Sequence, residues 1–291
     1  MIRQQADLGA LDQLFPRTRK IALMMKFLKF VAVGLILLVL LTVGACSLFL
    51  DKPRPTLSDA SGADEMARAM MAATHHDAWL QTGAVQWDFG GRQQHLWDRN
   101  RGYAQVDWGE NRVQLDLATR TGVAWVSGEQ VEGDAAAELL EKAWAFWCND
   151  SFWLNPIAKA FDEGTTRAIV ETDEGRALWV GYESGGVTPG DGYLWHFEDN
   201  GNGEDTTSSE NGGDVGLPTS WQMWTQILPM GGVRAGWEDW ITLETGAKIA
   251  TRHPTSLFEL VLSDVSGAAD VEQLTGGTDP FGPLETYLHM K

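Results

Sequence analysis

Two cysteines offer the most definite chemistry in this chain. Cys46 lies inside the apolar stretch LLTVGACSLFL, residues 40–50, where a thiol could carry a lipid, lie buried in a membrane helix, or react. The other, Cys148, lies in a helical pattern and is expected to be a small buried apolar residue and not a reactive thiol. The part of the chain after Cys46, called the body below, contains Cys148 as its one cysteine. No disulfide can form within it, so a hydrophobic core must stabilise it.

The histidines do not form a recognisable catalytic or metal site. His75 and His76 are adjacent, which is not the one-turn spacing of a paired helical ligand, so we expect a helix end there and no metal. The polar segment 199–214 has glycine at positions where a calcium-binding loop needs ligand side chains. We therefore expect a polar connecting loop there and no calcium site. No nucleophile-elbow, phosphate-loop or dinucleotide motif occurs. We therefore predict no catalytic residues, no metal and no cofactor, and hence not an enzyme.

Residues 30–50 form an apolar run of twenty-one residues without charge. This is about the length that crosses a ~30 Å hydrocarbon core as a helix. Basic residues precede the run, which predicts a cytoplasmic N-terminal side and an extracytoplasmic body. Residues 1–29 would then be a cytoplasmic extension with a basic n-region. If translation starts at Met24 or Met25, the first 23 residues are not part of the protein.

The tetrapeptide Val43-Gly44-Ala45-Cys46 resembles a bacterial lipobox, in which the cysteine receives a diacylglycerol before cleavage. Small residues before the thiol let the peptidase approach the backbone. The following residues, 51–61, are rich in Pro, Ser and Asp, as a tether would be. The apolar residues 47–50 favour the alternative of an uncleaved single-pass helix. Both alternatives anchor the body in a membrane.

The chain carries 22 Lys and Arg against 40 Asp and Glu, a net charge of −18. Six of the basic and two of the acidic residues precede Cys46, so the part from Cys46 onward carries about −22. Such a surface repels phosphate backbones and anionic headgroups. Nucleic acid is therefore not an expected partner.

The hydrophobic pattern predicts a helix over 64–77 and then a change to a period of two residues. Strands joined by short turns follow, which indicates an antiparallel meander. An apolar helical stripe over 134–147 interrupts this meander, and residues 149–151 should end that helix. A second short helix should begin at Asn155-Pro156. The predicted strands are 85–89, 94–99, 104–108, 113–117, 122–126, 167–172, 176–183, 193–198, 219–228, 236–243, 247–253 and 257–263.

These parts predict an α+β, mainly β domain over residues 62–291. The economical arrangement is one strongly curved antiparallel sheet, a half-barrel, whose concave face is covered by the N-terminal helix and a central helical hairpin. No internal repeat and no second domain are expected, and the protein is expected to be a monomer.

Two stretches make this pattern specific, AWLQTGAVQWDFGGRQQHLWDRNRGYAQVDWGE (78–110) and FWCNDSFWLNPIAKAFDEG (146–164). They contain a Trp after the first helix (Trp79), a Trp-Asp pair (Trp97-Asp98) and an Asn-Asp-x-x-Trp motif (149–153). With this order of elements, residues 62–265 resemble the outer-membrane lipoprotein-sorting (LolA/LolB-like) proteins, and more narrowly uncharacterised bacterial lipoproteins of that group. His75-His76 departs from the group, where small residues are more usual.

The resemblance implies a half-barrel with an apolar cavity beneath a helical lid, suited to a lipid or acyl chain. The fourteen tryptophans supply the aromatic walls that such a cavity needs. The alternative is that the same side chains pack as a closed core, because alternation shows burial and not an open space. The predicted lining residues are Trp87, Phe89, Trp108 and Leu115 on one half of the wall, and Trp179, Trp195, Trp224 and Trp240 on the other.

The sequence therefore favours a membrane-anchored lipoprotein of the cell envelope that binds lipid or another apolar ligand. The alternative is a structural or interaction lipoprotein with a closed core and a protein partner, which the sequence does not identify. Ser47 after the cysteine would favour the outer membrane under the enterobacterial sorting rule. We thus expect an outer-membrane lipoprotein more than a single-pass inner-membrane protein.

Overall fold

The computed structural model describes residues 25–26, 28–29, 31, 33–34, 51–57, 60–184, 189–198, 215–228 and 230–290. The chain divides into two compact units, Met1–Asp51 and Lys52–Lys291. In the first unit the described residues between 25 and 34 are helical, and the remaining described residue, Asp51, is not. Cys46, most of the predicted segment 30–50 and the loop 199–214 lie outside the described residues. No described helix has both the length and the apolar character needed to cross a membrane.

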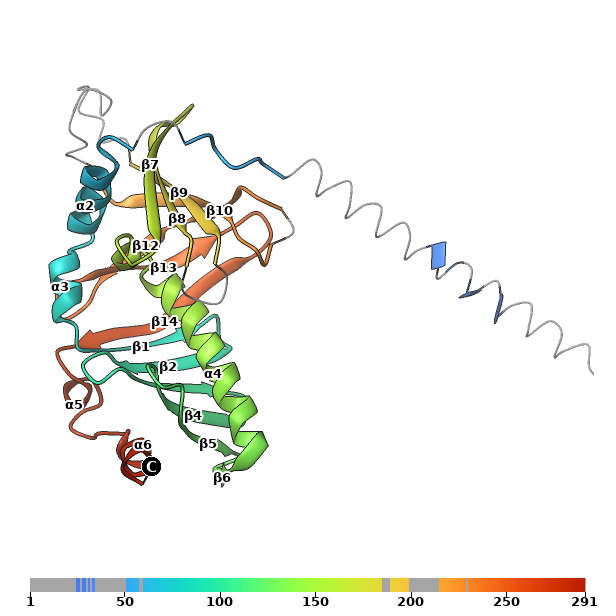
Figure 1. Cartoon of the computed structure of the whole chain (residues 1–291), viewed down its shortest axis with the longest axis vertical. Coiled ribbons are helices and arrows are strands. Elements are labelled where there is room, and N and C mark those ends of the chain that lie inside the picture. Colours follow the sequence, from blue (N-terminus) through green and yellow to red (C-terminus); the bar gives the residue numbers. More distant parts are fainter. Residues whose placement is uncertain are drawn as a thin grey trace, which may run out of the picture. The chain divides into compact units, whose positions relative to one another are not determined.

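The second unit, called the domain below, is built on two antiparallel sheets (Figure 1). The nine-stranded sheet has the order β12-β13-β14-β1-β2-β3-β4-β5-β6, and the five-stranded sheet has the order β11-β10-β9-β8-β7. The strands of the larger sheet are β1 (Ala84–Phe89), β2 (Gln93–Asp98), β3 (Tyr103–Trp108), β4 (Asn111–Asp116), β5 (Gly122–Val126), β6 (Glu129–Val131), β12 (Glu238–Thr242), β13 (Lys248–Pro254) and β14 (Glu259–Ala268). Those of the smaller sheet are β7 (Thr165–Thr172), β8 (Gly175–Tyr182), β9 (Asp191–Phe197), β10 (Pro218–Trp224) and β11 (Val233–Gly236).

The predicted α+β, mainly β class with antiparallel strands is confirmed, but the prediction of a single sheet is wrong. β11 pairs with β10 in one sheet, while β12 begins two residues after β11 ends and pairs with β13 in the other. Trp237 lies between these two strands and is 2% exposed. The chain therefore changes sheet around one buried aromatic residue, which a period-two pattern over 236–243 does not reveal. Within the described residues the sheets do not close into a barrel.

The N-terminal helix is shorter than predicted. It is divided into α2 (Ala63–Ala73) and α3 (His76–Gln81). His75, between them, has a φ of 55°, a left-handed conformation that ends one helix and lets the chain turn into the next. Its ring Nδ1 lies 2.9 Å from the carbonyl oxygen of Gly246. This contact with a distant strand connection accounts for the break that the helical periodicity did not show.

The predicted helical hairpin at the centre is also wrong, because α4 (Gly133–Leu154) is one helix of 22 residues. Only the short 3-10 turn η1 (Ile157–Lys159) follows it. The motif Asn149-Asp150-Ser151 was expected to end the helix because these residues compete for backbone hydrogen bonds. Instead, Asp150 is buried and its Oδ2 lies 2.7 Å from Nε2 of His95 on β2. This tertiary contact uses the carboxylate and allows the helix to continue.

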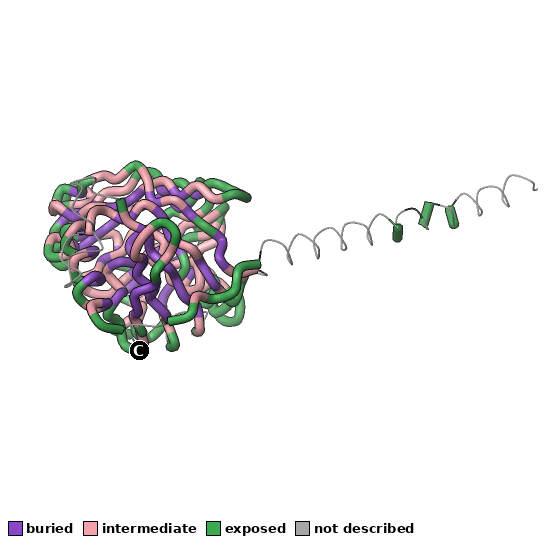
Figure 2. The backbone as a smooth tube through the Cα atoms, turned by 90° about the horizontal axis from the view of Figure 1, so that it is seen from above, coloured by how far each residue is buried: buried purple, intermediate pink, exposed green. Residues whose placement is uncertain are grey.

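The core lies mainly on the faces of the sheets that α4 covers. Figure 1 shows α4 lying along the domain, with its start beside β5 and β6 and its end toward the five-stranded sheet. In Figure 2 the buried residues concentrate in the middle of the domain. Three apolar clusters lie there, centred on Trp221, on Trp87 and on Leu115.

The C-terminal helices α5 (Val271–Leu274) and α6 (Gly282–His289) and the short strand β6 were not predicted. Phe281 and Leu284 are fully buried against the other face of the nine-stranded sheet. Arg101 fixes this packing, because its guanidinium donates to Asp279 at 2.7 Å and to Glu285 at 2.8 Å. The C-terminal segment is therefore part of the core of the domain.

Candidate functional site

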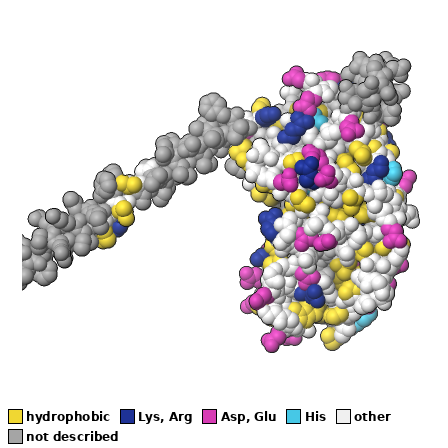
Figure 3. Space-filling view, turned by 180° about the vertical axis from the view of Figure 1, so that it is seen from behind, with side chains coloured by type: hydrophobic (Ala, Val, Ile, Leu, Met, Phe, Trp, Pro, Cys, Tyr) yellow, Lys and Arg dark blue, Asp and Glu magenta, His cyan; other side chains and the backbone are white. Residues whose placement is uncertain are grey.

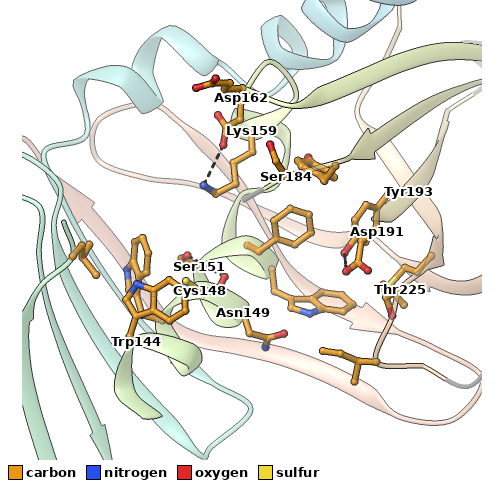
Figure 4. Close-up of a pocket in the computed structure, with 18 of the residues that line it drawn as sticks. Trp144, Cys148, Asn149, Ser151, Lys159, Asp162, Ser184, Asp191, Tyr193 and Thr225 are labelled. Atoms are coloured by element: carbon orange, nitrogen blue, oxygen red, sulfur yellow. Dashed lines mark hydrogen bonds and ion pairs between the residues drawn. The ribbon is translucent and has the colours of Figure 1, made fainter. Parts of the chain in front are cut away.

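A cavity of about 550 Å³ lies where the C-terminal half of α4 meets the five-stranded sheet. Its walls come from α4, from η1 and the turn after it, from β8, β9 and β10, and from the loop that follows β10. Figure 4 shows Trp144, Cys148 and Asn149 on one side of the space and Asp191, Tyr193 and Thr225 on the other. The cavity is thus formed by segments that are distant in the sequence.

One stripe of α4 supplies a wall of the cavity. Trp144, Trp147, Cys148, Ser151 and Phe152 all line it and follow one another at intervals of one, three or four residues. Positions three and four apart lie on the same face of a helix. Because α4 continues through Asp150, Ser151 and Phe152 stay on the face that begins at Trp144. A helix that ended at residue 149 would not place them there.

The floor of the cavity is aromatic. The ring of Phe152 lies 5.3 Å from that of Tyr182, 5.1 Å from that of Tyr193 and 5.9 Å from that of Trp221, measured between centroids. Tyr182 and Tyr193 point to the same face because Tyr193 pairs with Val180, two residues before Tyr182. Aromatic rings at these distances pack favourably and leave a rigid apolar surface.

Charged side chains are few and lie around this apolar floor. Lys159 Nζ lies 3.4 Å from Asp162 Oδ2, and the guanidinium of Arg120 lies 3.5 Å from the ring centroid of Trp144. Asp191 accepts the backbone N–H of Gln226 at 2.8 Å and the hydroxyl of Tyr193 at 3.5 Å. Each of these charged groups already has a partner within the domain. The arrangement matches ligand sites with apolar walls and a few orienting polar groups.

The thiol and the two phenols that line the cavity stay neutral. Burial raises the pKa of the Cys148 thiol to about 11, although Lys159 and Arg120 act in the opposite direction. Burial also raises the pKa of the Tyr182 and Tyr193 hydroxyls well above the usual range. A thiol in this state is a poor nucleophile at neutral pH, and both phenols remain hydrogen-bond donors. These three neutral groups can contact a ligand, and the two hydroxyls can donate hydrogen bonds to it.

The eight residues predicted to line a cavity are all placed elsewhere. None of them lines the cavity described above. Trp87 and Phe89 pack in one cluster beneath α4, Trp108 and Leu115 in a second, Trp195 and Trp240 in the aromatic cluster around Trp221, and Trp179 and Trp224 in a fourth.

Trp179 and Trp224 are on the opposite face of the five-stranded sheet from Trp195. Trp195 pairs with Leu178 and Trp221, so Trp179, the neighbour of Leu178, points the other way. The four residues predicted for the first half of the wall do share one face, since Val85, Trp97, Ala104 and Leu115 are aligned across the strands. That face is filled by α4 and holds a packed core.

For the residues of α4 that line the cavity, the sequence contains a pattern that could have predicted their position. The helical stripe that predicts 134–147 continues without a change of phase to Ser151 and Phe152. Tyr182 and Tyr193 lie in predicted strands, but neither the partner strand nor the face could be deduced. The loop residues Ile227 and Leu228 were predicted as strand, whereas β10 ends at Trp224.

Two buried histidines of the domain, His95 and His253, have structural contacts. His95 is bound to Asp150 and stacks on Trp87 with a centroid distance of 4.4 Å. His253 is fully buried against Trp237, and burial lowers its pKa to about 4. Among the described residues no group of three or more His, Cys, Asp or Glu is placed to hold a metal ion.

Comparison with protein-family models gives no match for this chain, and comparison with curated protein sequences gives none either. The arguments below rest on the residues of the domain and their geometry.

Proposed function

We propose that this chain is a membrane-anchored protein of the cell envelope that binds a lipid or another apolar ligand in the cavity beside α4. The observation that carries the proposal is a space of about 550 Å³ with an aromatic floor. Ligand sites of about 300–1,000 Å³ with apolar walls are typical of small-molecule binding. Trp144, Trp147 and Phe152 would contact the apolar part of the ligand, and the basic groups of Arg120 and Lys159 would lie near its polar end.

The resemblance to the lipoprotein-sorting group supports this proposal. In that group a curved sheet and a helical lid enclose a space for acyl chains. Here two sheets and α4 would together form the half-barrel, and the cavity would lie beneath the second half of the helix. The lining residues differ from the eight predicted from sequence, so the proposed site is moved to the end of α4.

The anchor remains the one that the sequence favours, a lipid on Cys46, with an uncleaved helix over 30–50 as the alternative. We propose an extracytoplasmic, outer-membrane location on this basis. Mass spectrometry of the mature N-terminus separates the two anchors. An acylated Cys46 identifies a lipoprotein, whereas an intact apolar segment identifies a signal anchor.

Ligand binding is tested by filling the cavity. Cys148→Trp places a large ring in the cavity, and Leu139→Trp adds the same ring on the other half of the same helix, away from the cavity. We expect the full-length Cys148→Trp protein to lose binding of a fluorescent fatty acid, and Leu139→Trp to retain it. Thermal unfolding of both variants controls for misfolding. Equal binding by wild type and a folded Cys148→Trp variant would exclude the cavity as the site.

The alternative of an interaction lipoprotein is favoured by one observation, that the eight predicted tryptophan, phenylalanine and leucine side chains all pack in closed clusters. In that case the purified full-length protein should contain no lipid by extraction and mass spectrometry. A co-purifying acyl chain, released by Cys148→Trp, favours the binding function.

A further inference from the structure

The segment that follows the predicted anchor is attached to the domain. Residues 52–54, called the strap below, lie against the end of β10 and the turn after it. The backbone N–H of Lys52 donates to the carbonyl oxygen of Gly231 at 3.1 Å, and its own carbonyl accepts the indole N–H of Trp224 at 2.8 Å. Arg54 donates to the carbonyl oxygens of Gly190 and Trp224. The strap therefore has a defined position in the fold.

Two glycines make this attachment possible. A Cβ on Gly231 would lie 2.2 Å from Cδ1 of Trp224 and 2.8 Å from the Lys52 carbonyl oxygen. A Cβ on Gly232 would lie 2.6 Å from Cβ of Lys52, and this residue also has a φ of 72°. Any larger residue at either position would displace the strap. The pair Gly231-Gly232 thus forms a seat for the chain that leaves the membrane.

Exposed apolar side chains lie close to this seat. Ile227 is 67% exposed, and it lies in the same β10–β11 connection that holds the strap. Leu257 and Phe258, in the turn between β13 and β14, are 64% and 48% exposed. Ile227 and Phe258 both line the cavity, so both loops border it. We call Ile227, Leu257 and Phe258 the apolar lip.

The turn that carries part of the lip is fixed. The hydroxyl oxygen of Thr255 accepts the backbone N–H of Leu257 at 3.1 Å and that of Phe258 at 2.9 Å. Both backbone donors are thus satisfied, while both side chains project into solvent. Exposed apolar side chains on a fixed turn are typical of an interaction surface.

The length of the connecting chain limits how far the lip can lie from the membrane. Lys52 lies six residue steps after Cys46, and a fully extended chain spans about 3.3–3.6 Å per residue, so the strap is held within roughly 20 Å of an acylated Cys46. If the apolar run 30–50 is instead a permanent helix, only Asp51 lies between it and the strap. Either anchor limits how far the strap can lie from the lipid surface.

We propose that the apolar lip lies in the interfacial region of the bilayer and that the strap orients the domain so that the edge of the cavity faces lipid. The partner is a bilayer rich in zwitterionic lipid, because the acidic domain repels anionic headgroups and the lip itself is apolar. This inference rests on the anchor in the proposed function, but it does not depend on a ligand in the cavity.

The test places an environment-sensitive nitrobenzoxadiazole label on the lip of the full-length protein, anchored in phosphatidylcholine and phosphatidylethanolamine vesicles. Cysteine is introduced as Ile227→Cys or Leu257→Cys in a Cys148→Ser background, and that background alone gives the blank. Met290→Cys is the matched control, since Met290 is 75% exposed and the C-terminus lies at the opposite end of the domain from β9 and β10 (Figure 1). We expect quenching by doxyl-labelled lipid several-fold greater at 227 and 257 than at 290.

Equal quenching at all three positions would overturn the proposal. The role of the strap is tested by a fifteen-residue Gly-Ser insertion between Asp51 and Lys52, which adds roughly 20 Å of average reach. Quenching at 227 should then fall toward that at 290, while fatty-acid binding stays unchanged. Unchanged quenching would show that the strap does not orient the domain. Loss of fatty-acid binding in Cys148→Trp tests the proposed function separately, so the two failures can be told apart.

Discussion

The two halves of α4 face very different surroundings. Its first half packs on the nine-stranded sheet, where Val113, Leu115 and Ala124 are fully buried against Ala143. Its second half carries large aromatic side chains and faces the cavity beside the five-stranded sheet. Small residues allow a helix to approach a sheet closely, whereas bulky rings hold neighbouring elements apart. Along one helix, the fully buried Ala143 lies where the domain is closed, and the aromatic side chains of the second half border the cavity.

The outer faces of the two sheets differ as well. The nine-stranded sheet is covered by α5 and α6, with Phe281 and Leu284 fully buried. The five-stranded sheet has Trp179 and Trp224 on its outer face, where the strap contacts Trp224 and Arg54 lies 5.9 Å from the Trp179 ring centroid. Figure 3 shows acidic and basic side chains interspersed with hydrophobic ones on the face it draws. The half with the cavity is also the half that holds the strap.

The largest effect is expected in the aromatic cluster below the cavity. Trp221 is fully buried, with ring centroids of Trp153 and Trp195 at 5.0 and 4.9 Å. Trp221→Ala should lower the free energy of unfolding by about 3–5 kcal/mol, as for other buried aromatic residues. Trp144→Ala, at the cavity wall, should cost clearly less because part of its surface is already open. Chemical denaturation measures both, and equal losses would mean that the two regions are packed alike.

A second large effect should depend on pH. The pKa of His253 is about 4 in the folded protein, since burial disfavours its charge, and about 6.5 when unfolded. As pH falls from 6.5 to 4 the unfolded chain binds the proton first, so folding loses up to roughly 3 kcal/mol from this group. His253→Phe removes that dependence. The difference in unfolding free energy between wild type and variant should shrink or reverse on acidification, and parallel pH curves would contradict this.

A smaller effect is expected from the contact that keeps α4 continuous. Asp150→Ala leaves the buried Nε2 of His95 without its partner at 2.7 Å, which should cost about 1–3 kcal/mol. Asp162→Ala removes an exposed partner of Lys159 at 3.4 Å and is the control, with an expected cost of at most about 0.5 kcal/mol. Calorimetric unfolding compares the two. If Asp150→Ala were as mild as Asp162→Ala, the buried pair would not explain the continuous helix.

The smallest effect concerns the strap. Trp224→Phe keeps an aromatic ring but removes the indole N–H that donates to the Lys52 carbonyl oxygen. A loss of about 1 kcal/mol in local stability is expected, which gives a few-fold faster hydrogen exchange at the Lys52 amide. Trp179→Phe, on the same face but without that bond, is the control. Equal exchange rates in both variants would show that the indole bond does not hold the strap.

Much of the fold follows from local pattern. The period-two alternation over Val85–Phe89 and the turn at Gly90-Gly91 predict the first hairpin, and the structure has β1 and β2 there with positive φ at both glycines. The predictions fail where a distant contact decides the outcome. Asp150 continues a helix because His95 binds it, and His75 breaks one near Gly246. Phe281 was not recognised as core because its partners lie on β3 and β5, far away in the sequence.

The sequence by itself determined the acidic charge, the apolar run over residues 30–50 and the mainly β class, because each depends on composition or on spacing along the chain. Only the tertiary structure decided which tryptophans pack in closed clusters, which stripe of α4 borders the cavity, and where the strap is seated. Those properties depend on strand register and on which faces meet. A shift of one residue turns a side chain to the opposite face, as it does for Trp179 and Trp195.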